Sequence, residues 1–194
     1  SLDELPASSL SAATPIYVRA AKPGGALTLS WLRILLGTEL DDPLQRLARL
    51  FGPRPHEIVV GWMQAALVGA CRLCGTRFEV ERAPGVRPNT PYLLIANHQS
   101  MFDIPIVGAL LFTNYPKYVS KRELSQWIPS ISYNLRRGGH ALIDRADRAQ
   151  AVDAIRELGE SAQARGVSVV IYPEGTRSRS GELKAFKPAG VITL

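Results

Sequence analysis

Cysteine and histidine are scarce in this chain. Its 194 residues include two cysteines, Cys71 and Cys74, and three histidines. The cysteines form a lone CxxC pair with no second pair and no histidine nearby, which leaves too few ligands for a four-coordinate structural zinc site. We interpret them as ordinary buried or half-buried thiols of a reducing compartment, with a redox or metal role as the open alternative. We expect no metal site.

Aromatic residues and long apolar runs are also few. Aromatic residues make up 7% of the chain and are not interleaved with Lys and Arg, which disfavours a nucleic-acid-binding surface. The longest apolar run without a charged residue, residues 58–71, has 14 residues, whereas a membrane-spanning helix needs about 20. There is no internal repeat, no evident signal peptide and no Met at position 1, so we expect a fragment or a processed form.

The composition is that of a globular domain with a basic surface. Hydrophobic residues make up 46% and charged residues 21%, and the length suits one domain rather than a tandem enzyme. The 23 Lys and Arg outnumber the 17 Asp and Glu, giving a net charge of +6. Residues 98–194 hold 13 basic and 9 acidic residues, and so carry four of these charges. The excess favours an anionic partner such as phosphate, lipid headgroups or nucleic acid.

The N-terminal part of the chain predicts apolar helices. They are expected over residues 26–37, 43–51 and 57–74, and contain Trp31 and Trp62. Such helices could belong to a protein core, or could lie in a bilayer interface, where Trp and Arg are favoured. Both interpretations are open on the pattern alone.

Two segments of turn-forming composition suggest how the chain is divided. Residues 1–24 mix Ser, Ala and Pro without a sustained period, which is typical of a loose lead-in. Residues 82–91 form a Pro/Gly linker, and we place the main boundary near residue 77. The predicted organisation is a lead-in and helical segment over residues 1–76, followed by an α/β domain over residues 77–194.

Beyond the linker, short apolar runs alternate with helical segments. Strands are predicted at residues 92–96, 117–120, 140–143 and 167–172, and helices over residues 103–112 and 147–165. Asp147 can cap the second helix and Gly166 can end it. Residues 140–172 then form a βαβ unit, whose two strands should be parallel with a right-handed crossover. The predicted fold class is α/β, with a largely parallel or mixed central sheet flanked by helices and preceded by the N-terminal helical segment.

Polar residues follow three of the predicted strands, where ligands of open α/β sheets bind. His98 and Asp103 are five residues apart, so they cannot touch on one helix but can meet across a strand–loop–helix turn. A carboxylate bound to one imidazole nitrogen orients the ring, and the other nitrogen can take a proton from a hydroxyl. Asp103 is equally well explained as a helix N-cap.

Cations accompany this pair. Arg145 follows one predicted strand end, Arg177 lies in the turn after another, and Lys121 follows a third. Convergent donors of this kind suit a phosphate dianion, although Arg145 could equally be a surface charge at a helix start. Within the same turn, Gly175 permits close approach of the backbone to a ligand, and Glu174 can hold a guanidinium or a ligand hydroxyl.

Four blocks in order over residues 92–188 resemble the glycerolipid acyltransferases, specifically the 1-acyl-sn-glycerol-3-phosphate (lysophosphatidate) acyltransferase family. Residues 97–103 (NHQSMFD) resemble the NHx4D block of that family. Residues 119–124 resemble its K-x-L segment, residues 139–145 its second block, and residues 172–178 (YPEGTRS) its FPEGTRS block.

The resemblance implies transfer of a fatty acyl group from acyl-CoA or acyl-carrier protein to the sn-2 hydroxyl of lysophosphatidate, giving phosphatidate for phospholipid biosynthesis. It implies no cofactor beyond this co-substrate. His98 is then the general base and Asp103 its orienting partner. The residues expected at the acceptor are Lys121, Arg145 and Arg177 on the phosphate, with Glu174, Gly175 and Thr176 shaping the site.

The implied substrates also bear on the N-terminal helices and the location. An enzyme of bilayer lipids gains from an interfacial anchor, so we expect residues 26–74 to associate with an anionic membrane surface. The expected location is the cytoplasmic face, at the inner membrane if the source is bacterial. No nucleic-acid partner is expected.

The sequence departs from the family pattern near its end. It stops at Leu194, where the family continues into a fourth block, and Pro188 stands where another residue is usual. We therefore expect a truncated piece with an incomplete acyl pocket. Two alternatives are open: an acyltransferase of the same fold acting on another lysophospholipid or an amino-acid lipid, and a non-catalytic basic protein that binds membranes.

Overall fold

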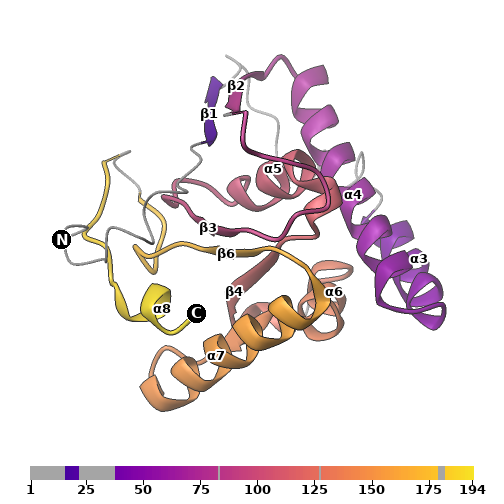
Figure 1. Ribbon diagram of the computed structural model, residues 1–194. Coiled ribbons are helices and arrows are strands. Elements are labelled where there is room, and N and C mark those ends of the chain that lie inside the picture. The colour runs from indigo at the N-terminus through magenta and orange to yellow at the C-terminus, as the bar shows by residue number, and fades with distance from the viewer. Residues whose placement is uncertain (1–15, 22–37, 83, 127, 179–181) are drawn as a thin grey trace.

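A four-stranded parallel sheet forms the centre of the computed structural model, which describes residues 16–21, 38–82, 84–126, 128–178 and 182–194 (Figure 1). Its strands are β3 (Leu93–Ile95), β4 (Lys117–Lys121), β5 (Ala141–Ile143) and β6 (Val169–Ile171). They lie in the order β3-β6-β4-β5, so β6 separates β3 from β4. Every adjacent pair is parallel, and the carboxyl ends of all four strands therefore share one edge.

Helices cover both faces of this sheet. The helices are α3 (Thr38–Leu50), α4 (Pro53–Leu73), α5 (Asp103–Leu110), α6 (Ile131–Arg137), α7 (Arg148–Arg165) and α8 (Ala189–Ile192), with short 3-10 turns η2 (Phe112–Asn114) and η3 (Arg122–Ser125). In Figure 1, α5 and α4 lie on one side of the sheet and α7 lies on the other. On the α5 side, the Tyr118 hydroxyl of β4 donates to the Ile104 carbonyl at 3.0 Å. The predicted α/β class is confirmed.

The α7 face holds the main apolar core. Leu158 and Ala162 of α7 pack with Ala141, Val167 and Val169, and each of the five is at most 6% exposed. Full burial of one such aliphatic side chain stabilises the fold by roughly 1.5–3 kcal/mol. The apolar side of α7, with Leu158 and Ala162, is therefore what holds this helix on the sheet.

The ends of α7 also lie where the sequence places them. The Asp147 Oδ1 atom accepts a hydrogen bond from the Gln150 N–H at 2.9 Å, which caps the first turn. At the other end, Gly166 adopts the left-handed conformation with φ 60°. β5 precedes α7 in the sequence and β6 follows it, and these two strands are parallel as predicted. In the sheet, however, β4 lies between them.

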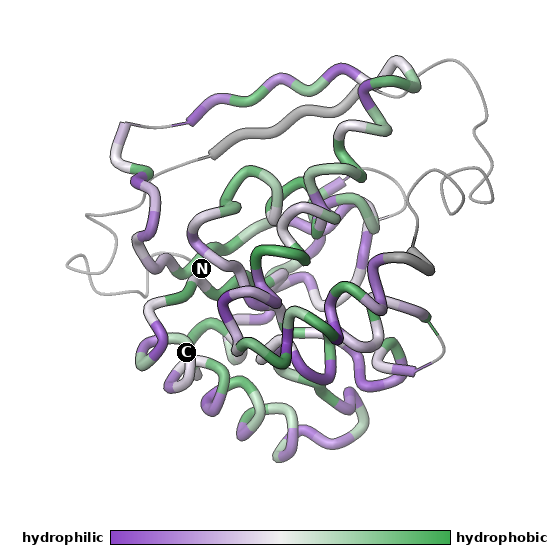
Figure 2. The backbone as a smooth tube through the Cα atoms, turned by 90° about the vertical axis from the view of Figure 1, so that its right-hand side faces the viewer, coloured by the Kyte–Doolittle hydropathy of each residue, from purple (hydrophilic) through white to green (hydrophobic). Residues whose placement is uncertain are grey.

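An additional strand pair corrects the prediction of a loose lead-in. Residues expected to be a loose lead-in form β1 (Ile16–Ala21), which pairs antiparallel with β2 (Arg77–Arg82) next to the predicted linker. In β2, Phe78 and Val80 alternate with charged residues, a period of two that is typical of a strand (Figure 2). The sequence of each short segment predicts a strand only weakly, because each strand is stabilised by pairing with a segment about 60 residues away.

The two described N-terminal helices are longer than predicted. α3 begins at Thr38 and contains Pro43, and α4 begins at Pro53, where the missing N–H of proline costs nothing. The predicted helix over residues 26–37 lies outside the described residues. Of the helices that the structure describes, none has the length and apolarity to cross a bilayer.

α4 and α5 approach each other closely. A Cβ atom added to Gly108 of α5 would lie 1.9 Å from the Gln64 Oε1 atom of α4, and one added to Gly61 would lie 2.6 Å from the Phe112 ring. Trp62 packs edge-on against the same ring, with centroids 5.7 Å apart. α4 therefore packs against the α/β layer, and the boundary near residue 77 stays a prediction.

Two glycines should respond oppositely to substitution by alanine. Neither Gly166 nor Gly69 has a neighbour within 4 Å of an added Cβ, so sterics do not decide the outcome. Gly166→Ala should lower the free energy of unfolding by about 1 kcal/mol, because alanine is strained in the left-handed region. Gly69→Ala, inside α4, should raise it by up to about 1 kcal/mol through helix propensity. Urea unfolding measures both, and a rise for Gly166→Ala would contradict the left-handed C-cap described for α7.

Candidate active site

The loops that follow β3 and β6 lie side by side because these two strands are neighbours. Ile95 pairs with Ile171 in the sheet, so the segments that follow β3 and β6 leave the sheet at the same edge. The Ser178 N–H then donates to the His98 carbonyl at 2.8 Å. The His98 N–H donates to the Glu174 Oε1 atom at 3.0 Å. Two blocks that are 76 residues apart in the sequence are thus joined by hydrogen bonds.

His98 and Asp103 meet across the loop after β3, as the sequence predicts. The His98 Nδ1 atom lies 2.7 Å from the Asp103 Oδ2 atom. The same oxygen accepts the N–H groups of Gln99 and Ser100, at 2.8 and 2.9 Å. The alternative role of Asp103 as a helix N-cap is wrong: it is the first residue of α5, and its carboxylate binds the loop before the helix.

The surroundings of His98 fix its ring. A carboxylate only accepts hydrogen bonds, so Nδ1 carries the proton and Nε2 is free to accept one. The ring stacks on Tyr172, with centroids 4.3 Å apart and planes inclined by 24°. The side chain of His98 is 18% exposed, so its second nitrogen is not sealed in the core. The imidazole is both oriented and reachable.

Tyr172 is the residue of this site that the sequence analysis missed. Its hydroxyl is buried and has no hydrogen-bond partner within the described ranges. Burial, followed by the nearby Asp103 carboxylate, raises the pKa of Tyr172, so the phenol stays neutral behind the imidazole. The available signal was its position as the last residue of the predicted strand, directly before Pro173.

The turn after β6 brings Glu174 inward. Glu174 is 2% exposed, and its Oε2 atom is buried without a hydrogen-bond partner among the residues described. Gly175 has φ 68°, which an L-residue rarely adopts, and its N–H closes the turn on the Tyr172 carbonyl at 3.0 Å. The predicted glycine turn is present, and Glu174 supports the backbone of His98.

The predicted cations lie on the same edge, apart from this network. Lys121 ends β4, Arg145 follows β5, and Thr176 and Arg177 follow β6. All four side chains are exposed, and none of the three cations has an ion-pair partner in the described part of the chain. The Lys184 ammonium donates to the Arg177 carbonyl at 2.8 Å. The structure thus links His98, Asp103 and Glu174 directly, and places the three cations at the ends of β4, β5 and β6 on the same edge of the sheet.

Neither cysteine is part of this edge. Cys71 and Cys74 are unpaired and half-buried near the end of α4, as the sequence indicates. Burial, followed by the neighbouring Cys74, raises the pKa of the Cys71 thiol, which makes it less reactive. Groups of three or more His, Cys, Asp or Glu able to hold a metal ion do not occur among the described residues.

Comparison with known proteins identifies the family. The Acyltransferase family model matches residues 77–193, more than half of the chain, and the chain belongs to this family. The sheep (Ovis aries) 1-acyl-sn-glycerol-3-phosphate acyltransferase alpha is 32% identical over 116 residues, which cover 59% of this chain and 39% of that protein. The 1-acyl-sn-glycerol-3-phosphate acyltransferase of Escherichia coli K12 is 31% identical over 140 residues, covering 71% and 55%. The chain thus spans about half the length of these relatives, or less.

A solved structure shares the fold. The 1-acyl-sn-glycerophosphate (LPA) acyltransferase PlsC of Thermotoga maritima matches with a TM-score of 0.59 and 20% identity. The match covers 85% of this chain and 64% of that one. At this identity the likeness supports the α/β architecture.

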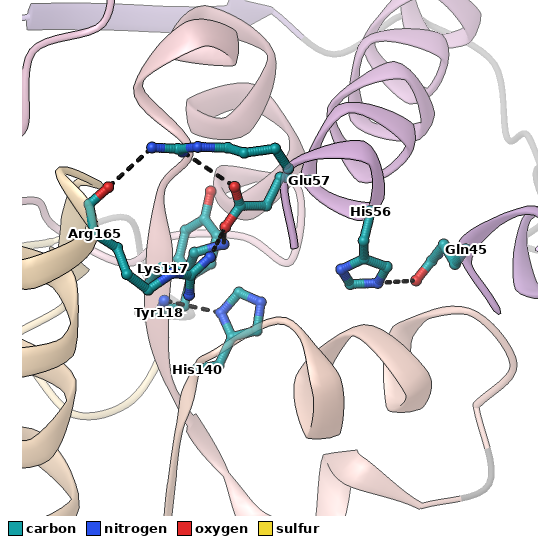
Figure 3. Close-up of polar contacts among 8 residues, drawn as sticks. Gln45, His56, Glu57, Lys117, Tyr118, His140 and Arg165 are labelled. Carbon is teal, nitrogen blue, oxygen red and sulfur yellow. Dashed lines mark hydrogen bonds and ion pairs between the residues drawn. The ribbon is translucent and has the colours of Figure 1, made fainter. Parts of the chain in front are cut away.

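A second group of titratable residues lies at the opposite edge of the sheet. The Glu57 carboxylate of α4 is buried and pairs with the Lys117 ammonium at 2.7 Å, with Arg165, and with Arg54 at 3.1 Å (Figure 3). Burial, against the opposing effect of Glu57, lowers the pKa of Lys117 to about 8. Burial alone would raise the pKa of Glu57, but Lys117 and Arg165 lower it overall. The sequence signal was a lone Glu at the start of an apolar helix.

Two histidines flank this group. His56 is 1% exposed, lies 3.3 Å from the Gln45 Oε1 atom through Nε2, and meets Tyr133 edge-on. Burial, with further contributions from Lys117 and Arg49, lowers the pKa of His56 to about 4. His140 accepts the Tyr118 N–H on Nδ1, and burial lowers its pKa as well. Both imidazoles are therefore neutral at pH 7.

The depressed pKa of His56 predicts a loss of stability in mild acid. The pKa is about 4 in the folded chain against 6.5 in the unfolded chain, so only the unfolded chain takes up this proton between those values. The free energy of unfolding should fall as pH drops from 6.5 to 4, by roughly 3 kcal/mol from this group. Replacing His56 with Gln should remove that part of the pH dependence.

Urea unfolding at pH 7 and at pH 4.5 measures this effect in both proteins. His140 titrates in the same direction and is present in both, so only the difference between the two pH slopes reports on His56. Equal slopes for the wild type and His56→Gln would show that His56 does not titrate in this way.

Proposed function

We propose that this protein transfers a fatty acyl group from acyl-CoA or acyl-carrier protein to the sn-2 hydroxyl of lysophosphatidate, giving phosphatidate. The observation that carries the proposal is the His98–Asp103 pair, with 2.7 Å between Nδ1 and Oδ2, at the carboxyl edge of the sheet. Membership of the Acyltransferase family supports it, as do relatives about 30% identical that are named 1-acyl-sn-glycerol-3-phosphate acyltransferases.

The proposed chemistry follows from the free nitrogen of His98. Nε2 accepts the proton of the sn-2 hydroxyl as its oxygen attacks the thioester carbonyl, and the Asp103 carboxylate stabilises the imidazolium that forms. The tetrahedral intermediate then collapses, the C–S bond breaks, and the thiolate takes the proton from His98. A thiol has a pKa of about 8.5, so it leaves without a strong acid, and the reaction needs no metal or redox cofactor.

The acceptor phosphate is assigned to the exposed cations. Lys121, Arg145 and Arg177 lie at the same edge of the sheet as His98, and a phosphate monoester carries the negative charge that they match. Glu174 and Gly175 fix the turn beside His98, and Thr176 follows them on the surface. In this assignment the cations hold the phosphate while the sn-2 hydroxyl meets Nε2.

Membrane association is assigned to α3 and α4. Large apolar side chains on these helices and the turn between them are 39% to 85% exposed: Leu44, Leu47, Leu50, Phe51, Ile58, Trp62 and Leu73. A lysophospholipid and its product lie in the bilayer, and in this proposal these exposed apolar residues enter its interface while the basic surface meets anionic headgroups. The proposed location is the cytoplasmic face of a membrane.

Removing the base should abolish turnover. His98→Ala in the full-length protein should slow thiol release from palmitoyl-CoA, with lysophosphatidate as acceptor, by at least about a hundredfold. Asp103→Asn should also lose at least about a hundredfold, since it disturbs both the tautomer and the loop. A His98→Ala protein as active as the wild type would exclude acyl transfer by this mechanism.

The cations should select the headgroup. Arg177→Ala should raise the KM for lysophosphatidate about tenfold or more, because a charge-assisted hydrogen bond is lost. It should change the KM for lysophosphatidylethanolamine, whose phosphate is masked, much less. Arg156→Ala, on an exposed part of α7, is the matched control. Wild-type preference for lysophosphatidylethanolamine would keep the mechanism and change the acceptor.

A further inference from the structure

A cavity of about 230 Å³ opens at the amino edge of the sheet, opposite His98. It lies where the ends of four helices meet: Arg49 near the end of α3, His56 and Glu57 at the start of α4, Arg137 at the end of α6, and Arg165 at the end of α7. Arg165 precedes β6 and Arg137 precedes β5, whereas His98 and Glu174 follow their strands. The cavity and the candidate active site therefore occupy opposite edges of one sheet.

The charged residues around this cavity are mostly positive. Glu57 is the single carboxylate in its lining, and it is already paired with Lys117, Arg165 and Arg54. Arg49 and Arg137 have no ion-pair partner among the residues that the structure describes. One concave site is thus bordered by two unpaired guanidinium groups and by the Arg165 guanidinium, which also pairs with Glu57. Guanidinium groups are strong ligands for phosphate oxygens.

Two observations favour an anion over solvated surface arginines. First, three of the four charged side chains that line the cavity are arginines, and the fourth, Glu57, is already paired, so the lining keeps a net positive charge. Second, the residues next to Arg49 are exposed apolar ones, Leu50 at 81% and Phe51 at 75%. A cationic cavity beside an exposed apolar turn suits a molecule with an anionic head and apolar chains.

We propose that this cavity binds a phosphate group through Arg49, Arg137 and Arg165, and that the phosphate is the headgroup of an anionic phospholipid. This site is separate from the proposed acceptor site and does not depend on the chemistry there. A lipid bound at the α3–α4 turn holds the amino edge of the sheet on an anionic membrane. Free inorganic phosphate offers the same ligand atoms, and the experiment distinguishes it from the lipid.

The test compares two double variants of the full-length protein with equal net charge. Arg49→Ala/Arg137→Ala removes the two unpaired guanidinium groups of the cavity. Arg77→Ala/Arg156→Ala removes two exposed arginines on β2 and on the middle of α7, away from the cavity. Circular dichroism establishes that both variants fold. All of the substituted arginines lie outside the apolar core, so neither variant should unfold the chain.

Two measurements follow. One is partitioning onto phosphatidylcholine vesicles with and without about one fifth phosphatidylglycerol, at physiological salt. The other is the change in melting temperature on replacing chloride with inorganic phosphate at equal ionic strength, since a ligand that binds the folded state raises it.

We expect the cavity variant to partition onto the anionic vesicles at least about tenfold more weakly than the control variant, with no difference on neutral vesicles. If phosphate raises the melting temperature of the wild type and the control but not of the cavity variant, while vesicle binding is equal, the site takes free phosphate, and the lipid assignment is overturned. If the two variants behave alike in both measurements, the cavity is not an anion site.

Discussion

One buried carboxylate, Glu57, joins three layers of this molecule. It anchors the start of α4 to β4 through Lys117 and to the end of α7 through Arg165, and Arg54 adds a hydrogen bond to the Arg165 carbonyl. A buried charge is costly unless it is paired, and leaving one partner of such a group alone typically costs about 3–5 kcal/mol. Sliding α4 along the sheet would break all of these contacts together. The position of the helical layer relative to the sheet therefore depends on this group.

The opposite edge uses a carboxylate in a different way. The Asp103 Oδ2 atom accepts hydrogen bonds from two backbone N–H groups and from the His98 imidazole. One atom therefore both stabilises the loop and orients the ring. Glu174 supplies the next support, from the neighbouring strand. The imidazole is thus held by groups on two loops. Because β3 and β6 position these loops, the orientation of the ring depends on the pairing of the two strands.

The features that could be predicted from the sequence are formed by residues that lie close together along the chain. The α7 helix, its Asp147 cap and its Gly166 end are encoded within 20 consecutive residues, and the structure has them in place. The contact between His98 and Asp103 is also local, because it closes across one short loop. The class of fold followed from the alternation of such segments.

What could not be predicted depends on distant pairing. The insertion of β6 between β3 and β4 is not visible in any single strand, and neither is the pairing of β1 with β2. Glu57 meets Lys117 and Arg165, 60 and 108 residues later, and only the folded chain brings them together. Tyr172 behind His98 belongs to the same class, since the ring contact requires the β3–β6 register.

The central place of β6 has a consequence for synthesis on the ribosome. β3 emerges long before β6, its partner in the described sheet, because Leu93 pairs with Val169, 76 residues later. At about 5–20 residues per second, translation leaves β3 without β6 for roughly 4–15 s. During that interval its apolar edge has no partner from the sheet, and such an edge can pair with other chains. Rapid growth at high expression should therefore place more demand on chaperones for this protein than its size alone suggests.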